Sequence, residues 1–215
     1  MVVEQDLRIV DLDQDGVTAL IRLSDGDTME LAVDSLPPAL PAPGEALPPG
    51  MLDVLRAGAE RKAIAKRVFV MLDRKLRTRR DMEEKLVERG HDPEQVAAVL
   101  DRFEAQGVHS DRTFAAAWCR DTIRARAVGR HYLVAKLCGR GIARATVVSV
   151  VDAELTADTE RELALAAARS WYRKNPGGDD WNRRARAQRF LNGRGFPSTL
   201  VRSAVAAAFG EGDCA

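Results

Sequence analysis

A six-residue pattern occurs three times in this chain and constrains its fold more than any other feature. It reads LVERGH, LCGRGI and LNGRGF, and its fifth residue is the glycine Gly90, Gly141 and Gly195 in turn. These glycines are separated by 51 and then 54 residues. A repeat with a period near 50 residues predicts tandem units that bury their apolar faces against one another.

The pattern is typical of a helix that ends at a glycine. Glycine enters the left-handed conformation without a steric penalty, and the residue after it packs back on the leucine four positions before the glycine. Asp92 and Pro93 follow the first copy and suit the N-cap and first position of a new helix. Each copy is therefore predicted to form a sharp bend between two helices, which we call a corner.

Helical periodicity of apolar residues continues through the rest of the chain. In the first helix it places five side chains on one face: Ile64, Val68, Met71, Leu72 and Leu76. Thr78, Ser110 and Thr156 are placed to begin later helices. We therefore predict a mainly α fold with three three-helix units, followed by a tail at 211–215; the units span 58–108, 109–155 and 156–210.

The N-terminal part has a different pattern. Val17, Ala19, Ile21 and Leu23 alternate with other residues, and turn signals containing Asp and Gly lie on both sides. This alternation predicts a small antiparallel β region over residues 1–35. Six prolines follow, and we predict a stiff, Pro-rich linker over residues 36–57.

The net charge of +1 hides an asymmetry between the two ends of the chain. Residues 1–60 contain 3 Lys and Arg against 12 Asp and Glu, whereas residues 61–215 contain 30 against 20. A basic body behind an acidic N-terminal part favours an anionic partner for the body. The alternative explanation is that the basic residues of the body lie on ordinary solvent-exposed helix faces and bind no partner.

Catalysis and metal binding have little support. His91, His109 and His131 have no nearby nucleophile and no metal-ligand spacing, and the three cysteines are far apart in the sequence. We expect no enzyme activity, no cofactor and no metal site. No apolar run approaches the roughly 20 residues that span a bilayer, so we expect no membrane partner and a cytoplasmic location.

Arginines recur at matching positions of the repeat. Arg79, Arg130 and Arg184 each stand eleven residues before a corner glycine. If the units stack, such positions recur along one face, which suits a phosphate backbone. The candidate binding residues are Arg74, Arg77, Arg79, Arg80, Arg130, Arg140, Arg184, Arg186, Arg189 and Arg194. Arg89, Arg140 and Arg194 directly precede the corner glycines, and they have an alternative, purely structural explanation as helix C-terminal caps.

The sequence also supports two predictions about which parts of the chain would contact nucleic acid. The helix after the first corner carries Glu94, Asp101 and Glu104, so these helices are poorly suited to reading base edges as a recognition helix does. Trp118 and Trp171 occupy equivalent places among apolar residues, and we predict them to be core positions rather than platforms for bases.

Over residues 64–209 the chain resembles the RecX family of bacterial RecA regulators. Four segments in the same order carry the resemblance: Leu72–Leu86 with Arg77-Thr78, Gly107–Ala115, Gly129–Ile142, and Phe190-Leu191 with Arg194-Gly195-Phe196. Tyr132 and Lys136 depart from the family pattern, which usually has arginine and glutamate there. These departures leave open which side chains of the second unit make contacts.

The resemblance implies a non-enzymatic modulator in homologous recombination, DNA repair and the SOS response. Such a protein would bind RecA filaments along their groove and inhibit recombinase, ATPase and coprotease activity. Expected partners are the RecA filament and single- or double-stranded DNA bound without sequence preference, with the chain itself a monomer. A sequence-independent DNA-binding protein and an α-helical protein-interaction scaffold are the alternatives.

Overall fold

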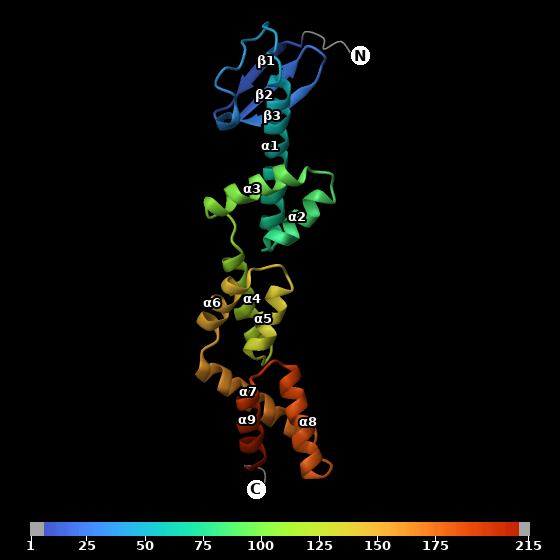
Figure 1. The fold of residues 1–215 in the computed structure, drawn as a ribbon, viewed down its shortest axis with the longest axis vertical. Helices are drawn as coiled ribbons and strands as arrows, with labels where there is room; N and C mark the ends of the chain where they lie inside the picture. The colour runs from blue at the N-terminus through green and yellow to red at the C-terminus, as the bar shows by residue number, and fades with distance from the viewer. Residues whose placement is uncertain (1–6, 211–215) are drawn as a thin grey trace. The chain divides into compact units, whose positions relative to one another are not determined.

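The computed structural model describes residues 7–210, which are mainly helical with one small sheet near the N-terminal end (Figure 1). The predicted fold class, helical units preceded by a small antiparallel sheet, is confirmed. The predicted tail at 211–215 and the start of the predicted β region at 1–6 lie outside the described residues.

The described residues form two compact units. Unit 1 contains residues 7–77 and 81–109, and unit 2 contains residues 78–80 and 110–210. The short segment 78–80, where the second helix begins, therefore packs with the residues of unit 2.

The sheet of unit 1 is an antiparallel meander, as the alternating pattern predicts. Ala19, Ile21 and Leu23 are buried on one face of the middle strand. Gly16 and Gly26 in the two turns have φ angles of 86° and 91°, which favour glycine. The strands pair in the order β1 (Ile9–Gln14), β2 (Thr18–Leu23) and β3 (Thr28–Ala32).

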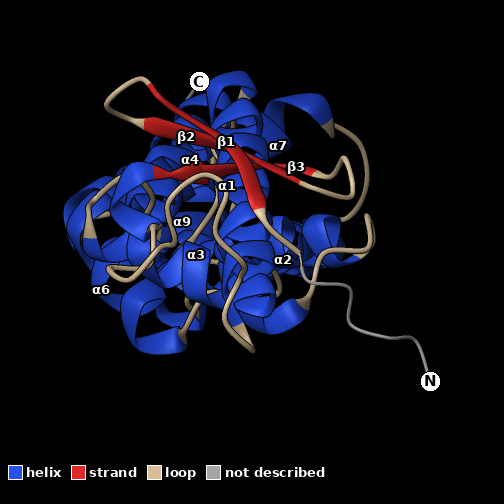
Figure 2. Cartoon of the chain, turned by 90° about the horizontal axis from the view of Figure 1, so that it is seen from above, coloured by secondary structure: helices blue, strands red, loops and turns tan. Residues whose placement is uncertain are grey.

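The sheet packs on the long helix α1 (Met51–Arg74), mainly through β3 (Figure 2). Leu31 of β3 lies directly on Gly58 of α1, where an added Cβ would come within 2.6 Å of the leucine Cδ2. Ile9, Ile21, Leu31 and Leu55 belong to one buried cluster. The sheet and the first half of α1 therefore share a core.

The Pro-rich segment is fastened to this core. The Gly44 N–H donates to the carbonyl of Ile9 at 2.7 Å, and Leu40 and Leu47 pack against the buried cluster. Helix α1 begins at Met51, inside the range that the prolines predict as a linker up to residue 57. Because Leu40 and Leu47 of the Pro-rich segment pack against the core of the sheet, the segment is not a free spacer.

The second half of α1 packs with α2 (Arg79–Val87) and α3 (Pro93–Ala105) around a core that includes Ile64, Val68, Leu86 and Phe103. The Asp92 carboxylate accepts the Gln95 N–H at 3.0 Å, which confirms it as the N-cap of α3. Leu76 was predicted on the buried face of the first helix, and this is wrong. The chain leaves α1 for extended backbone at Lys75, so the helical period stops there and Leu76 is 48% exposed.

Unit 2 holds two further groups of three helices (Figure 1). The predicted caps Ser110 and Thr156 both accept backbone N–H groups at the starts of their helices, from Arg112 and Thr159 respectively. One group comprises α4 (Asp111–Ala125), α5 (Arg130–Cys138) and α6 (Arg144–Glu154), and the other comprises α7 (Ala157–Lys174), α8 (Asp180–Gly193) and α9 (Ser198–Gly210).

All three corners stop a helix as predicted, with glycine φ angles of 87°, 85° and 78° at Gly90, Gly141 and Gly195. At the first, the His91 N–H donates to the Leu86 carbonyl at 3.2 Å. At the third, the Phe196 N–H donates to the Leu191 carbonyl at 3.4 Å. These are the bonds of the glycine-terminated motif that the leucine and glycine spacing predicts.

Candidate functional site

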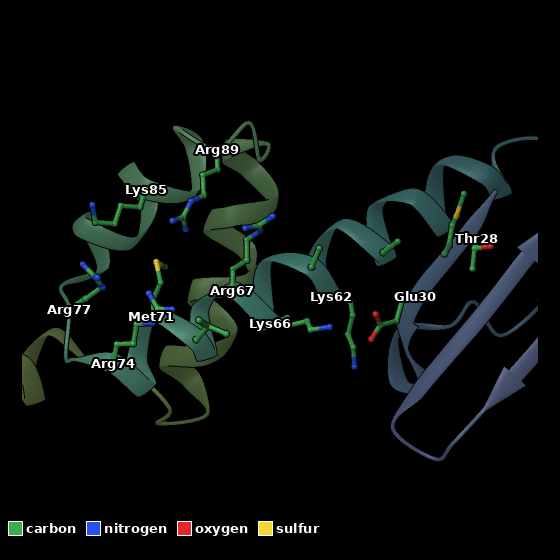
Figure 3. A pocket seen from close by; sticks show the side chains of 14 residues that line it. Thr28, Glu30, Lys62, Lys66, Arg67, Met71, Arg74, Arg77, Lys85 and Arg89 are labelled. Atoms are coloured by element: carbon green, nitrogen blue, oxygen red, sulfur yellow. The ribbon is translucent and has the colours of Figure 1, made fainter.

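A groove of about 810 Å³ in unit 1 collects most of the basic residues near the first corner (Figure 3). Its walls come from β3, α1, the connection after α1, and α2 with its corner. Glu30 is the one acidic residue among the described residues that line it. The cations that line it are Lys62, Lys66, Arg67, Arg74, Arg77, Lys85 and Arg89.

Helix α1 supplies four of these cations because of its amphipathic sequence. Lys62, Lys66 and Arg74 are separated by four and eight residues, which places them on one stripe of the helix. Ile64 and Val68 lie between them in sequence and are fully buried in the core on another face. Packing of the apolar stripe therefore fixes where the basic stripe points.

The groove cations are not neutralised. Among the residues that the structure describes, none of the seven forms an ion pair, although the Lys62 Nζ donates to the Thr18 hydroxyl at 3.0 Å. The Nε of Arg77 is buried and has no hydrogen-bond partner. An unmade hydrogen bond of this kind costs about 1–3 kcal/mol. Clustered, unpaired cations in a hollow create a positive potential that attracts an anionic ligand.

The two ends of the groove differ in charge. Figure 3 shows Arg67, Arg74, Arg77, Lys85 and Arg89 on the side where Met71 lies. Lys62 and Lys66 lie on the side where Glu30 projects from β3. The α2 end is therefore the more strongly cationic part of the groove.

Of the ten arginines selected from the sequence, the groove contains Arg74 and Arg77. The other five cations of the groove belong to the basic stretch around the first corner, but they were not among the selected residues. The candidates were confined to arginines, some of which share a repeat position, so the lysines of α1 and α2 were not among them. Amphipathic periodicity of α1 was the signal that would have found Lys62, Lys66 and Arg67.

Arg79 and Arg80 belong to unit 2 and take part in its packing. The Arg79 N–H donates to the Asp111 carboxylate at 2.8 Å. The side chain of Arg80 lies against the corner at Gly141, where an added Cβ would come within 2.5 Å of the arginine Cδ. Their side chains have further contacts.

Arg130 is held by two carboxylates. Its Nε lies 3.2 Å from Glu160, which is only 3% exposed, and its Nη1 lies 3.1 Å from Asp152. The Arg130 N–H also donates to Glu160 at 2.7 Å. The guanidinium charge is thus balanced inside unit 2. Glu160 lies thirty residues away in sequence, and the spacing of basic residues gave no sign of this pair.

Arg140 and Arg194, which precede the corner glycines of unit 2, also make contacts within that unit. The Arg194 Nη1 donates to the Ala127 carbonyl at 2.9 Å, and its guanidinium lies 4.7 Å from the Phe190 ring centroid. The Arg140 guanidinium lies 5.5 Å from the ring centroids of both Phe114 and Trp118. These contacts are structural, but they are made to a loop carbonyl and to aromatic rings and not to the helix C-termini that capping would involve.

The three remaining candidates lie on α8 and are exposed: Arg184, Arg186 and Arg189. Their neighbour Arg183 is buried, donates to the Asn175 carbonyl at 3.1 Å and pairs with Asp180.

The predicted core positions Trp118 and Trp171 both pack on buried clusters, and each is partly exposed.

Unit 1 has a second, apolar hollow of about 530 Å³ between the sheet, α1 and α3. Phe69 and Phe103 line it and meet edge to face, with ring centroids 4.8 Å apart. Arg102 and Asp34 form an ion pair at its rim, 2.5 Å long. Its lining has little in common with the cationic groove.

Within residues 7–210, His, Cys, Asp and Glu side chains nowhere gather in a group of three or more that would hold a metal ion. The helices of the same range include none that is both long and apolar enough for a bilayer.

Comparison with known proteins now adds to this geometry. Residues 67–103 match the family model described as "RecX, first three-helix domain", and residues 158–205 match "RecX, third three-helix domain". The first matched range overlaps the cationic groove, and the second includes α8.

Two curated relatives named regulatory protein RecX are each 32% identical to this chain. The one from Halorhodospira halophila aligns over 71% of this chain and 92% of the relative. The one from Chromohalobacter salexigens aligns over 65% of this chain and 88% of the relative.

Solved structures show the same fold. A crystal structure of regulatory protein RecX has a TM-score of 0.79, with 21% identity over 92% of this chain and 98% of that chain. The crystal structure of RecX from Lactobacillus salivarius has a TM-score of 0.65, with 15% identity over 69% and 96%. Taken with the sequence relatives and the family models, these findings show that the chain belongs to the RecX family of regulatory proteins.

Proposed function

We propose that this chain regulates the RecA recombinase by binding RecA–DNA filaments through the cationic groove of unit 1 and inhibiting their ATPase, recombinase and coprotease activities. The observation that carries the proposal is a groove lined by seven cations that form no ion pair with any described residue, where Glu30 is the one acidic residue among the described residues of the lining. Family membership supports a regulatory role, and RecA, DNA and the cytoplasm as the site of action follow from the family resemblance.

The chemistry of the groove suits a phosphate backbone. Lysine and arginine side chains bind phosphates and release condensed counterions, which gives affinity without reading sequence. Arginine also donates two parallel hydrogen bonds to one phosphate. The donors of the Arg67, Arg77 and Arg89 guanidiniums therefore fit a strand that enters the α2 end of the groove.

Inhibition follows from where such a regulator would sit. A chain that holds DNA phosphates within a filament also lies beside the RecA subunits that coat this DNA. It would hinder the rearrangements that accompany each round of ATP hydrolysis and block access of a second DNA or a coprotease substrate. None of these effects needs a catalytic group in the regulator.

The test is the ATPase rate of RecA on single-stranded DNA with increasing amounts of the full chain. We expect the native chain to slow hydrolysis. A variant with Arg67, Arg77, Lys85 and Arg89 all changed to Gln should lose at least about tenfold in inhibitory potency, since several charge-assisted contacts are removed together. Each contact contributes about 1.5–3 kcal/mol at most.

A control with the same change in net charge separates position from charge. Arg56, Arg124, Arg173 and Arg202 are exposed and lie outside the groove. Changing these four to Gln should leave inhibition within about twofold, because surface charges beyond a Debye length of about 8 Å are screened. Equal loss in both variants, or a native chain that speeds hydrolysis, contradicts the proposal.

The same titration separates the two alternative functions. A general DNA-binding protein would bind naked and RecA-coated DNA alike, with a steep salt dependence in both cases. A protein-interaction scaffold would bind its partner with little response to salt, and the apolar hollow beside Phe69 is the surface that would serve it.

A further inference from the structure

Trp181 at the start of α8 is 76% exposed, although tryptophan is highly buried on average. Among the described residues, no aromatic ring and no cation lies in contact with its indole. Trp118 and Trp171 in the same unit both pack on buried clusters. The fold of unit 2 therefore does not use the Trp181 ring, and the ring is available to a ligand.

The helix that carries Trp181 is basic and contains no carboxylate from that residue to Arg194. Arg184, Arg186 and Arg189 are exposed, and none forms an ion pair with a described residue. Arg184 follows Trp181 by three residues, so the two lie on neighbouring turns of the same side of the helix. The Arg184 guanidinium lies 5.5 Å from the Phe209 ring centroid and has no carboxylate partner among the described residues. An exposed indole next to an exposed guanidinium is thus a property of this surface.

A shallow hollow of about 390 Å³ lies between α7 and α8. Arg186, Arg189, Trp171 and Asn175 line it, and the Arg186 guanidinium lies 5.8 Å from the Trp171 ring centroid. The basic side chains of α8 therefore extend from the exposed indole to a second, partly covered one.

We propose that α8 is a contact site for single-stranded nucleic acid, in which an unpaired base stacks on Trp181 and a neighbouring phosphate binds Arg184. Aromatic rings accept any base on their faces, and nearby guanidiniums hold the backbone. Bases of a duplex are stacked within the helix and cannot lie on the indole. The site therefore prefers single strands.

This proposal is independent of RecA and of the groove, because its residues belong to unit 2 and its test uses naked nucleic acid. Asp179 and Asp180 precede the tryptophan, but Asp179 caps α8 and Asp180 pairs with Arg183. Their carboxylates disfavour a phosphate on that side. The strand is thus expected to extend from Trp181 toward Arg184.

The experiment compares two single strands of about 20 nucleotides, one of oligothymidine and one abasic, which share the phosphate backbone but differ in having bases. Binding of the labelled strands to the full chain is followed by fluorescence anisotropy. We expect Trp181→Ala to weaken oligothymidine binding about tenfold and abasic binding less than about twofold, since one stacked base is lost. Trp181→Phe should retain most of the affinity.

Two further variants locate the effect. Phe69→Ala in unit 1 removes another exposed aromatic ring and should leave both strands bound as in the native chain. Arg184→Gln should weaken both strands alike, because phosphates are common to them. Thermal unfolding of each variant checks that unit 2 remains folded.

A native chain that binds the two strands equally well would overturn the proposal, and so would a Trp181→Ala variant that weakens both to the same degree. A Trp181→Ala variant that binds oligothymidine with native affinity would also overturn it, and would indicate a protein partner for Trp181. Any of these outcomes leaves the RecA proposal standing, because the groove variants test that separately.

Discussion

The same Arg-Gly corner serves different purposes in the two units. At Gly195 in unit 2, an added Cβ would overlap the backbone nitrogen of Tyr132, and at Gly141 it would come within 2.5 Å of the Arg80 side chain. At Gly90 in unit 1 it would meet nothing within 4 Å. The corner is therefore a packed joint in unit 2 and an open surface in unit 1.

The corner arginines follow the same division. Arg194 and Arg140 make contacts within unit 2, with a backbone carbonyl and with aromatic rings. Arg89 lines the cationic groove and has no ion-pair partner among the described residues. A repeated motif thus sets the bend of the chain, and whether another segment packs on that bend decides whether its arginine supports the fold or faces a ligand.

The largest expected effect separates the packed corner from the open one. Gly195→Ala should lower the unfolding free energy of unit 2 by more than about 4 kcal/mol, because the new methyl group would overlap a backbone that cannot move aside. Gly90→Ala should cost only about 1–2 kcal/mol, the cost of left-handed backbone without glycine. Urea unfolding followed by circular dichroism measures both. Similar losses in the two variants would contradict the division of the corners.

A smaller effect tests whether Arg130 belongs to the fold. Arg130→Met leaves Glu160 buried without its cation, and we expect a loss of about 2–3 kcal/mol in unfolding free energy. Arg74→Met in the groove should cost less than about 0.5 kcal/mol, because its side chain is exposed and unpaired. If Arg130→Met unfolds like the native protein yet loses filament binding, then Arg130 contacts the ligand instead.

The smallest effect compares matched corner arginines. Arg89→Gln should weaken filament binding several-fold, by about 1 kcal/mol, with no change in melting temperature, since it removes one phosphate contact. Arg194→Gln should do the reverse, lowering the melting temperature by a few degrees with little change in binding. Melting curves and anisotropy titrations of the two variants give this comparison directly. A melting temperature lowered only by Arg89→Gln would reverse the assignment.

Local features of the fold were predictable because they depend on neighbours in sequence. The stop at Gly90 and the cap at Asp92 follow from the preferences of glycine and aspartate at helix ends. Leu76 failed because its periodicity was extrapolated past Lys75, where extended backbone ends the helix. Nothing in the apolar pattern marked that end.

The site was less predictable because it depends on contacts between distant residues. Arg130 pairs with Glu160 and Arg80 lies on Gly141, and neither contact is visible in the spacing of basic residues. Glu30 reaches the groove only because β3 packs on α1 at Gly58. Sequence therefore indicated a basic first unit, while the choice of side chains that remain unpaired required the fold.

The salt dependence of binding to RecA-coated single-stranded DNA tests the central claim most directly. A plot of log affinity against log salt should lose a slope of about 0.7–0.9 for each phosphate contact removed. We predict a loss of about 3 in slope when Arg67, Arg77, Lys85 and Arg89 become Gln, and no change for the variant of Arg56, Arg124, Arg173 and Arg202. Equal slopes for the native chain and the groove variant would contradict the account.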